Sequence, residues 1–292
     1  MANLKEIRNR ISSVGSTMQI TSAMKMVSTA KLKRAQDAIV QMRPYAIKLK
    51  EILMNLSATL DLSENPFSEE REEGKTLIVG ISSDRGLCGG FNNAISKNIN
   101  NTISNKFNGS SDVHVFGLGK KIRDAYKRSD RFFTNDFLKE REDIYADLSF
   151  ENLSEVASEL MDLYKSGEFN RIYVVYNRFV NAATQTVEIE QFLPIQAPEN
   201  IEATSNSDYI FEPSKEEIIE DLIPKTLKIQ LFKALLDSNA AEHGARMTAM
   251  DKATENASEL QKELKLSYNK ARQAAITNEI LEIVGGAEAL NA

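Results

Sequence analysis

The sequence predicts an α/β protein in which two long terminal helices pair as an antiparallel coiled coil beside a central Rossmann-like α/β domain. The two ends of the 292-residue chain are almost free of glycine and proline, and their apolar residues recur at steps of three and four. Between them, short apolar runs alternate with helical patterns, which favours a mostly parallel sheet. We therefore expect a shaft helix at 1–61, a central domain at 75–200 and a second shaft helix at 214–287.

The N-terminal segment predicts one long helix. From Leu4 to about Leu60 the only helix breakers are Gly15 and Pro44. The apolar residues have a mean step of 3.5, and a shift near Ile20 indicates a stutter in a coiled-coil seam. Such a helix is roughly 80 Å long, whereas a globular protein of this size is only about 40 Å across. It must project from any domain, and Pro44 is expected to kink it or break it locally.

The C-terminal segment has the same character. Ser214 and Glu217 resemble a capping box that begins a helix, and the glycine pair at 285–286 is expected to end it. Alanines at every fourth position over 241–257 let two helices approach closely. An ordinary amphipathic helix packed on a core is the alternative for either segment. Two long seams flanking one central domain favour antiparallel pairing instead.

The middle of the chain is predicted to consist of shorter strands and helices joined by loops. Two polar stretches that contain proline, 62–74 and 197–209, are predicted loops. The predicted strands are 76–82, 113–116, 171–176 and 186–193, and the predicted helices are 92–105, 120–127 and 150–165.

Charge is distributed unevenly along the chain. The net charge is −6, yet the segment from Leu4 to Ala58 carries ten basic and three acidic residues, hence +7, which leaves −13 for the remainder. A basic helix on an acidic protein indicates an acidic partner, although a solvated helix face is the alternative. The negative net charge of the chain does not favour binding to nucleic acids, which are themselves negative. The N-terminus lacks a signal-peptide core, no run approaches a membrane span, and a single cysteine fits a reducing compartment.

The best candidate for chemistry is the glycine-rich stretch at 82–92, directly after a predicted strand. Such turns bind phosphate through bare amides, but the spacing matches neither nucleotide-binding pattern, so we interpret it as a tight strand-to-helix turn. Cys88 is expected to be a core thiol, because only His114 and His243 could activate it. We therefore predict no catalytic residue, no cofactor and no metal site.

Several long motifs nevertheless carry a family resemblance. They are Ile7-Arg-Asn-Arg-Ile, ITSAMKMV at 20–27, Arg43-Pro-Tyr, SSDRGLCGGFN at 82–92, ARMTAM at 245–250, YNKARQAAIT at 268–277 and EIVGGA at 282–287. In this order, and over essentially the whole chain, they resemble the γ subunits of F-type ATP synthases, of the bacterial type.

This resemblance implies a rotor shaft. It would turn inside a ring of α and β subunits and stand on a membrane ring of c subunits together with ε. Proton flow would thus be coupled to ATP synthesis, with nucleotide and Mg²⁺ bound to α and β. The chain itself would be non-catalytic and peripheral, at the cytoplasmic face of the cell inner membrane, with membrane contact only through the complex.

The resemblance also implies contact residues. Those expected to face the catalytic head are Met24, Lys25, Lys31, Lys33, Arg34, Arg246, Arg272, Gln273, Thr277, Ile280 and Val284. Those expected near the foot are Arg43, Tyr45 and Tyr209. Two alternatives stay open: a nucleotide-binding α/β enzyme with helical arms, which the turn at 86–90 would serve, and a coiled-coil scaffold for an unrelated partner.

Overall fold

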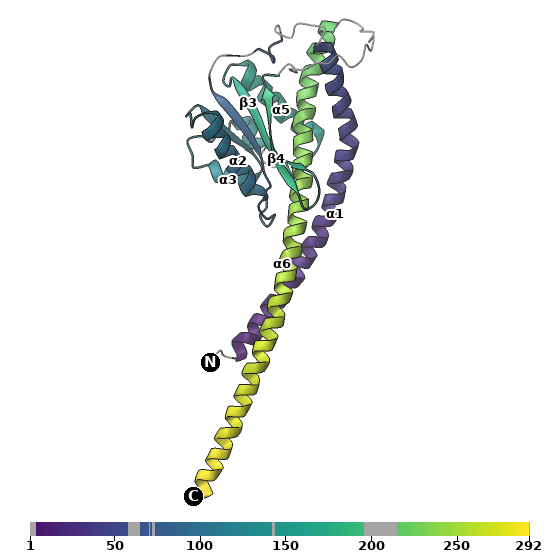
Figure 1. Cartoon of the computed structure of the whole chain (residues 1–292). Coiled ribbons are helices and arrows are strands. Elements are labelled where there is room, and N and C mark those ends of the chain that lie inside the picture. The colour runs from purple at the N-terminus through teal and green to yellow at the C-terminus, as the bar shows by residue number, and fades with distance from the viewer. Residues whose placement is uncertain are drawn as a thin grey trace. The chain divides into compact units, whose positions relative to one another are not determined.

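The computed structural model describes residues 4–57, 65–69, 71, 74–141, 144–195 and 215–291. The predicted loops at 62–74 and 197–209 fall largely outside these residues. The chain divides into two compact units, one of residues 1–28 with 247–292 and one of residues 29–246. The elements, drawn in Figure 1, are α1 (Leu4–Ser57), β1 (Thr76–Ile81), α2 (Phe91–Lys106), β2 (Val113–Leu118), α3 (Lys120–Tyr126), α4 (Asp136–Glu140), α5 (Phe150–Lys165), β3 (Arg171–Phe179), β4 (Gln185–Leu193) and α6 (Lys215–Asn291).

The two long terminal helices are confirmed, with 54 residues in α1 and 77 in α6. Of the two outcomes expected at Pro44, a kink or a local break, the break is wrong because α1 continues through this residue, and the kink stays a prediction. The helix end expected at Gly285 and Gly286 is also wrong, because α6 runs on to Asn291. Neither glycine has the positive φ that a left-handed C-terminal cap requires. A glycine in helical conformation costs only about 1 kcal/mol relative to alanine, which does not by itself stop a helix.

The central sheet has four strands in the order β2-β1-β3-β4. Strand β1 is parallel to both neighbours, with Ile78 opposite Val115 on one side and Tyr173 on the other. Strand β4 closes the sheet antiparallel to β3. The mostly parallel sheet predicted from alternating strands and helices is therefore confirmed.

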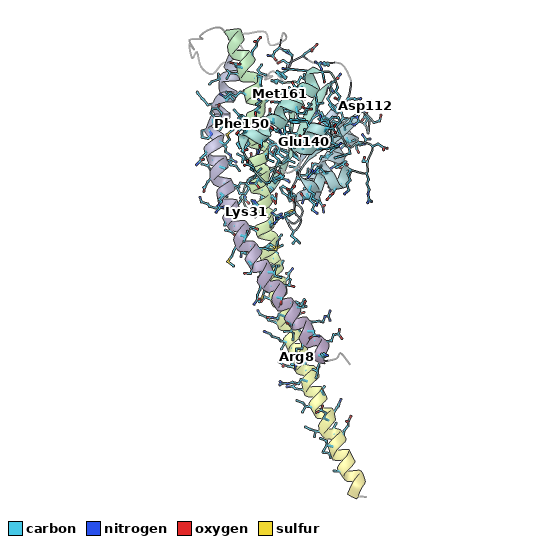
Figure 2. All side chains as sticks on the ribbon, turned by 180° about the vertical axis from the view of Figure 1, so that it is seen from behind. Arg8, Lys31, Asp112, Glu140, Phe150 and Met161 are labelled. Carbon is cyan, nitrogen blue, oxygen red and sulfur yellow. The ribbon has the colours of Figure 1, made fainter. Side chains whose placement is uncertain are left out.

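Helices cover both faces of this sheet, in agreement with Figure 1. Successive residues of β1 point to opposite faces, and all six are buried. Leu77 packs on the face covered by α5 and by the first part of α6, where Met161 of α5 (labelled in Figure 2) also lies. Ile78 packs on the face covered by α2 and α3. Because α6 supplies core side chains such as Leu231, the part of this helix up to Arg246 belongs to the same compact unit as the sheet.

Candidate functional site

In the unit formed by residues 4–28 and 247–291, polar pairs join α1 to α6. The hydroxyl oxygens of Thr21 and Thr254 are 2.8 Å apart. One turn further along α1, the Lys25 ammonium donates to Asp251 Oδ1 at 2.5 Å. A step of four residues forward on α1 is matched by a step of three residues back on α6. The two helices of this unit are therefore antiparallel.

Nearer the start of α1 the same unit has a third polar pair. Arg8 Nη2 donates to the Tyr268 hydroxyl oxygen at 2.8 Å, and its guanidinium carbon lies 5.7 Å from the ring centroid. This hydrogen bond is the main reason that the pKa of Arg8 lies above its usual value. At Gly15 a Cβ would lie 2.9 Å from the Gln261 side-chain nitrogen, so the glycine permits a close approach of the helices.

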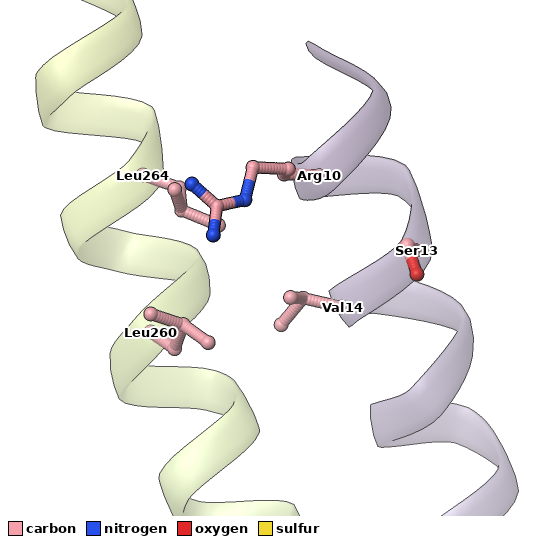
Figure 3. Close-up of a pocket in the computed structure, with 5 residues that line it drawn as sticks. All are labelled: Arg10, Ser13, Val14, Leu260 and Leu264. Carbon is pink, nitrogen blue, oxygen red and sulfur yellow. The ribbon is translucent and has the colours of Figure 1, made fainter. Parts of the chain in front are cut away.

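A shallow groove of about 260 Å³ lies between the two helices of this unit, and Figure 3 shows its walls. Leucines of α6 face a valine and an arginine of α1 across it. The lining residues are Arg10, Ser13, Val14, Leu260 and Leu264. It is open and mixed in polarity, with none of the enclosure expected of a small-molecule site.

The basic residues of α1 that were predicted to face a partner differ in how they are engaged. Lys31 (labelled in Figure 2) and Arg34 are exposed. Lys33 is also exposed, but its ammonium donates to Asp37 one turn away at 2.9 Å. Met24 is half-buried. Their contacts with partners stay a prediction.

The predicted contact residues near the end of α6 lie at the surface. Arg272 and Gln273 are exposed, and the Thr277 hydroxyl donates to the Gln273 carbonyl at 2.9 Å. The side chains of Ile280 and Val284 are 54% and 55% exposed. Large apolar side chains at this exposure are available to an apolar partner, which the structure of this chain alone does not supply.

Arg246 stands apart from the other predicted contact residues because it is buried, with only 10% of its side chain exposed. Its Nη1 donates to Glu242 Oε1 at 2.5 Å, one turn earlier on α6. Its Nη2 donates to the backbone carbonyls of Arg85 at 3.1 Å and Gly86 at 3.3 Å. The residue that the resemblance assigned to a partner is thus held inside this chain.

The glycine-rich turn at 82–92 is the tight strand-to-helix turn that we expected. The backbone N–H of Ser83 donates to Asn92 Oδ1 at 3.1 Å. Asp84 Oδ1 accepts from the backbone N–H of Lys120 at 2.9 Å. A phosphate bound here would need backbone amides of the turn, and a side-chain oxygen already engages the amide of Ser83.

Cys88 lies within this turn and is 1% exposed, which confirms the prediction of a core thiol. Its Sγ accepts from Asn92 Nδ2 at 3.2 Å. His114 lies in β2 as expected, and burial lowers its pKa. Within the described ranges, no group of three or more His, Cys, Asp or Glu side chains is placed to hold a metal ion.

Several titratable groups near Arg246 are perturbed. Burial raises the pKa of Glu242; nearby Asp84 raises it further, while Arg246 opposes the shift. Burial also raises the pKa of Tyr145 well above its usual value. Burial lowers the pKa of His243 to about 4, with Arg246 acting in the same direction. Glu242 and Arg246 are themselves buried, so α6 carries charged side chains through a buried region here.

The residues predicted near the foot are only partly described. Tyr45 is 45% exposed. Arg43 Nη2 lies 3.6 Å from Oδ1 of Asp237, whose side chain is 1% exposed. Burial raises the pKa of that carboxyl and the arginine lowers it. Tyr209 lies outside the described residues.

Sequence reasoning missed the acidic residues that organise these contacts. Asp237 and Glu242 lie in a stretch of α6, residues 234–245, that is mostly apolar or small. A charge in such a stretch indicates a buried partner, and that signal was present. No local pattern, however, indicates that Arg246 bonds to carbonyls 160 and 161 residues away.

Among the helices of the described residues, none is both long enough and apolar enough to cross a membrane.

The pattern of the ATP synthase family matches residues 3–290. The ATP synthase gamma chain of Christiangramia forsetii is 59% identical over 292 residues, covering all of both chains.

Solved structures share the fold. A chain of the Euglena gracilis mitochondrial ATP synthase (OSCP/F1/c-ring) has a TM-score of 0.64 at 20% identity, over 98% of this chain and 94% of that one. A chain of the Tetrahymena thermophila mitochondrial ATP synthase (central stalk/c-ring) has a TM-score of 0.58 at 22% identity, over 80% of this chain and 99% of that one. The sequence matches carry the assignment: this chain belongs to the γ-subunit family of the F-type ATP synthases.

Proposed function

We propose that the chain is the central rotor shaft of its ATP synthase, and that its rotation couples proton flow through the membrane sector to ATP synthesis in the catalytic head. Family membership supports the complex. The observation that carries the mechanical role is the antiparallel helix pair joined by Thr21–Thr254 and Lys25–Asp251. Torque passes along two helices only if they do not slide, and specific polar pairs oppose sliding because a slip leaves each group unpartnered.

In this proposal the partners are the α and β subunits of the head, ε, and the c-ring. The Tetrahymena and Euglena chains that share the fold come from assemblies described as containing a c-ring. The chain would be peripheral at the cytoplasmic face of the inner membrane, attached through the complex. It would be non-catalytic, as the resemblance implies, and its glycine-rich turn at 82–92 matches neither nucleotide-binding pattern.

The exposed cations of α1 support an acidic partner. Lys31 and Arg34 are exposed on a segment that carries +7, opposite in sign to the rest of the chain. An exposed ion pair contributes only about 0–1 kcal/mol. We therefore assign these charges to the rate and orientation of assembly, and the exposed apolar residues around Ile280 to contact within the head.

Co-expression with the α and β subunits of the same organism tests this function. We expect a stable complex with one copy of this chain for every three β subunits, measured by native mass spectrometry. A chain that remains free while α and β assemble without it would contradict the proposal. Stable capture of unrelated proteins in place of α and β would favour the scaffold alternative. Calorimetry of the isolated chain with ATP and with NAD tests the enzyme alternative, which requires a heat of binding.

A further inference from the structure

The contacts of Arg246 within this chain indicate a role in addition to the partner contact that the resemblance implies, which stays a prediction. A guanidinium has five N–H donors in a fixed fork. One arm is directed to Glu242 and the other to the carbonyls of Arg85 and Gly86. With 10% of the side chain exposed, little of the group is available to another subunit.

The turn that Arg246 contacts is also anchored from within, by Ser83 and Asn92. Ser83 is fixed at the base, where Asn92 accepts from its backbone N–H. Leu87, at the tip, is 65% exposed and has a φ of 63°, a region that a leucine rarely adopts. Such a conformation persists only where the surroundings impose it. The carbonyls of the two residues before Leu87 are those that Arg246 binds.

The Arg85 carbonyl also links the guanidinium to the interior of the turn. It accepts from the Ser83 hydroxyl at 2.7 Å. The Cys88 sulfur lies 3.8 Å from the same carbonyl oxygen. Loss of the arginine would therefore loosen the carbonyl around which the buried thiol is packed.

We propose that Arg246 is a positioning residue, oriented by Glu242, which latches the 82–92 turn to α6 so that the turn and this part of α6 move as one body. The latch rests on the proposed rotor function for its purpose, since it would carry a displacement of α6 directly to the central domain. Its existence is a property of this chain and does not require any other subunit.

Cys88 provides a built-in reporter, because it is the only cysteine of the chain and is 1% exposed. The test is the rate at which iodoacetamide alkylates Cys88 in the isolated full-length chain under native conditions. We expect Arg246→Gln to raise this rate about tenfold or more, because hydrogen bonds to a charged group are lost and local opening becomes easier. Arg246→Lys should also raise it, since an ammonium cannot fork between Glu242 and two carbonyls.

Glu242→Gln tests whether Glu242 orients Arg246. It also provides a second variant in case Arg246→Gln does not fold. We expect a smaller rise than for Arg246→Gln. The double variant should react no faster than Arg246→Gln alone, because both changes act on one contact. Arg272→Gln is the matched control, the same change at an exposed position of the same helix, and should leave the rate unchanged.

Hydrogen exchange separates the latch from general stabilisation. If the latch exists, amides of the turn exchange faster in the Arg246 variants while those of β1 keep the wild-type rate. Alkylation rates within about twofold of wild type in all three single variants would overturn the proposal. So would a rise in Cys88 reactivity that is matched by faster exchange throughout β1, because the contacts would then stabilise the whole domain without positioning the turn. Failure of the chain to assemble with α and β would refute the rotor function and leave this test unaffected.

Discussion

At the scale of single residues, His243 shows how burial in α6 becomes a dependence of stability on pH. Burial lowers its pKa to about 4, and its Nδ1 has no hydrogen-bond partner among the described residues. The unfolded chain binds a proton near pH 6.5, whereas the folded chain does not until about pH 4. The contribution of His243 is therefore fully present above pH 6.5 and is lost as the pH falls toward 4.

We predict that His243→Gln flattens the loss of stability between pH 7 and pH 4.5. The difference should be about 2 kcal/mol, already reduced because the ring is only partly buried. Urea unfolding of both proteins at the two pH values measures it. Glu242 has a raised pKa and changes stability in the opposite direction, so only the comparison between variants isolates the histidine. His114→Gln is the comparison: burial also lowers the pKa of His114, so we expect a smaller effect in the same direction, and an equal effect of both substitutions would contradict the assignment.

Gly119 has a backbone that only glycine adopts readily. Its φ is 104°, and a Cβ there would lie 2.1 Å from the Ser82 carbonyl oxygen. We predict that Gly119→Ala lowers the free energy of unfolding by at least about 3 kcal/mol, through strain and a backbone clash. Gly90→Ala is the control, because no described residue lies within 4 Å of its Cβ position. Equal urea midpoints for the two variants would refute this reading.

At the scale of elements, the antiparallel helix pair has a defined register. Replacing Thr21 and Thr254 by cysteine in a Cys88→Ser background should give rapid intramolecular disulfide formation, because the two hydroxyl oxygens are 2.8 Å apart. Cysteines at Thr21 and Gln261 are the out-of-register control, two helical turns away. Mass spectrometry of the oxidised chains measures both yields. Equal yields would mean that the register is not fixed.

How far each element could be predicted depended on whether its signal was local. The three parallel strands were predictable because buried parallel strands are apolar runs, as in Leu77 to Ile81, whereas the antiparallel strand β4 was predictable from its alternating residues. The end of α6 was not, because the glycine pair at 285–286 opposes a helix without preventing it. The helix pairing followed from periodicity, but the contacts of Lys25 and Arg246 did not. These contacts join residues more than 150 positions apart, and only the folded chain brings them together.

At the scale of the whole molecule, the basic charge of α1 should govern how the chain meets its partners. Electrostatic attraction acts mainly on association rate and is weakened by salt. We predict that Lys31→Gln with Arg34→Gln slows assembly with α and β several-fold at low ionic strength and little at high ionic strength. Lys33→Gln is the control, because its ammonium is already paired with Asp37. Stopped-flow fluorescence measures the rates, and an equal effect of the control would contradict a specific role.

The central claim is that this chain turns. The most direct test is to immobilise a reconstituted complex of α, β and this chain, attach a bead to the chain, and observe it during ATP hydrolysis. We expect continuous rotation of the bead in one direction, which stops when the chain is crosslinked to β and resumes on reduction. Steady ATP hydrolysis with a bead that does not rotate would show that the chain is a static part of the complex and not a rotor.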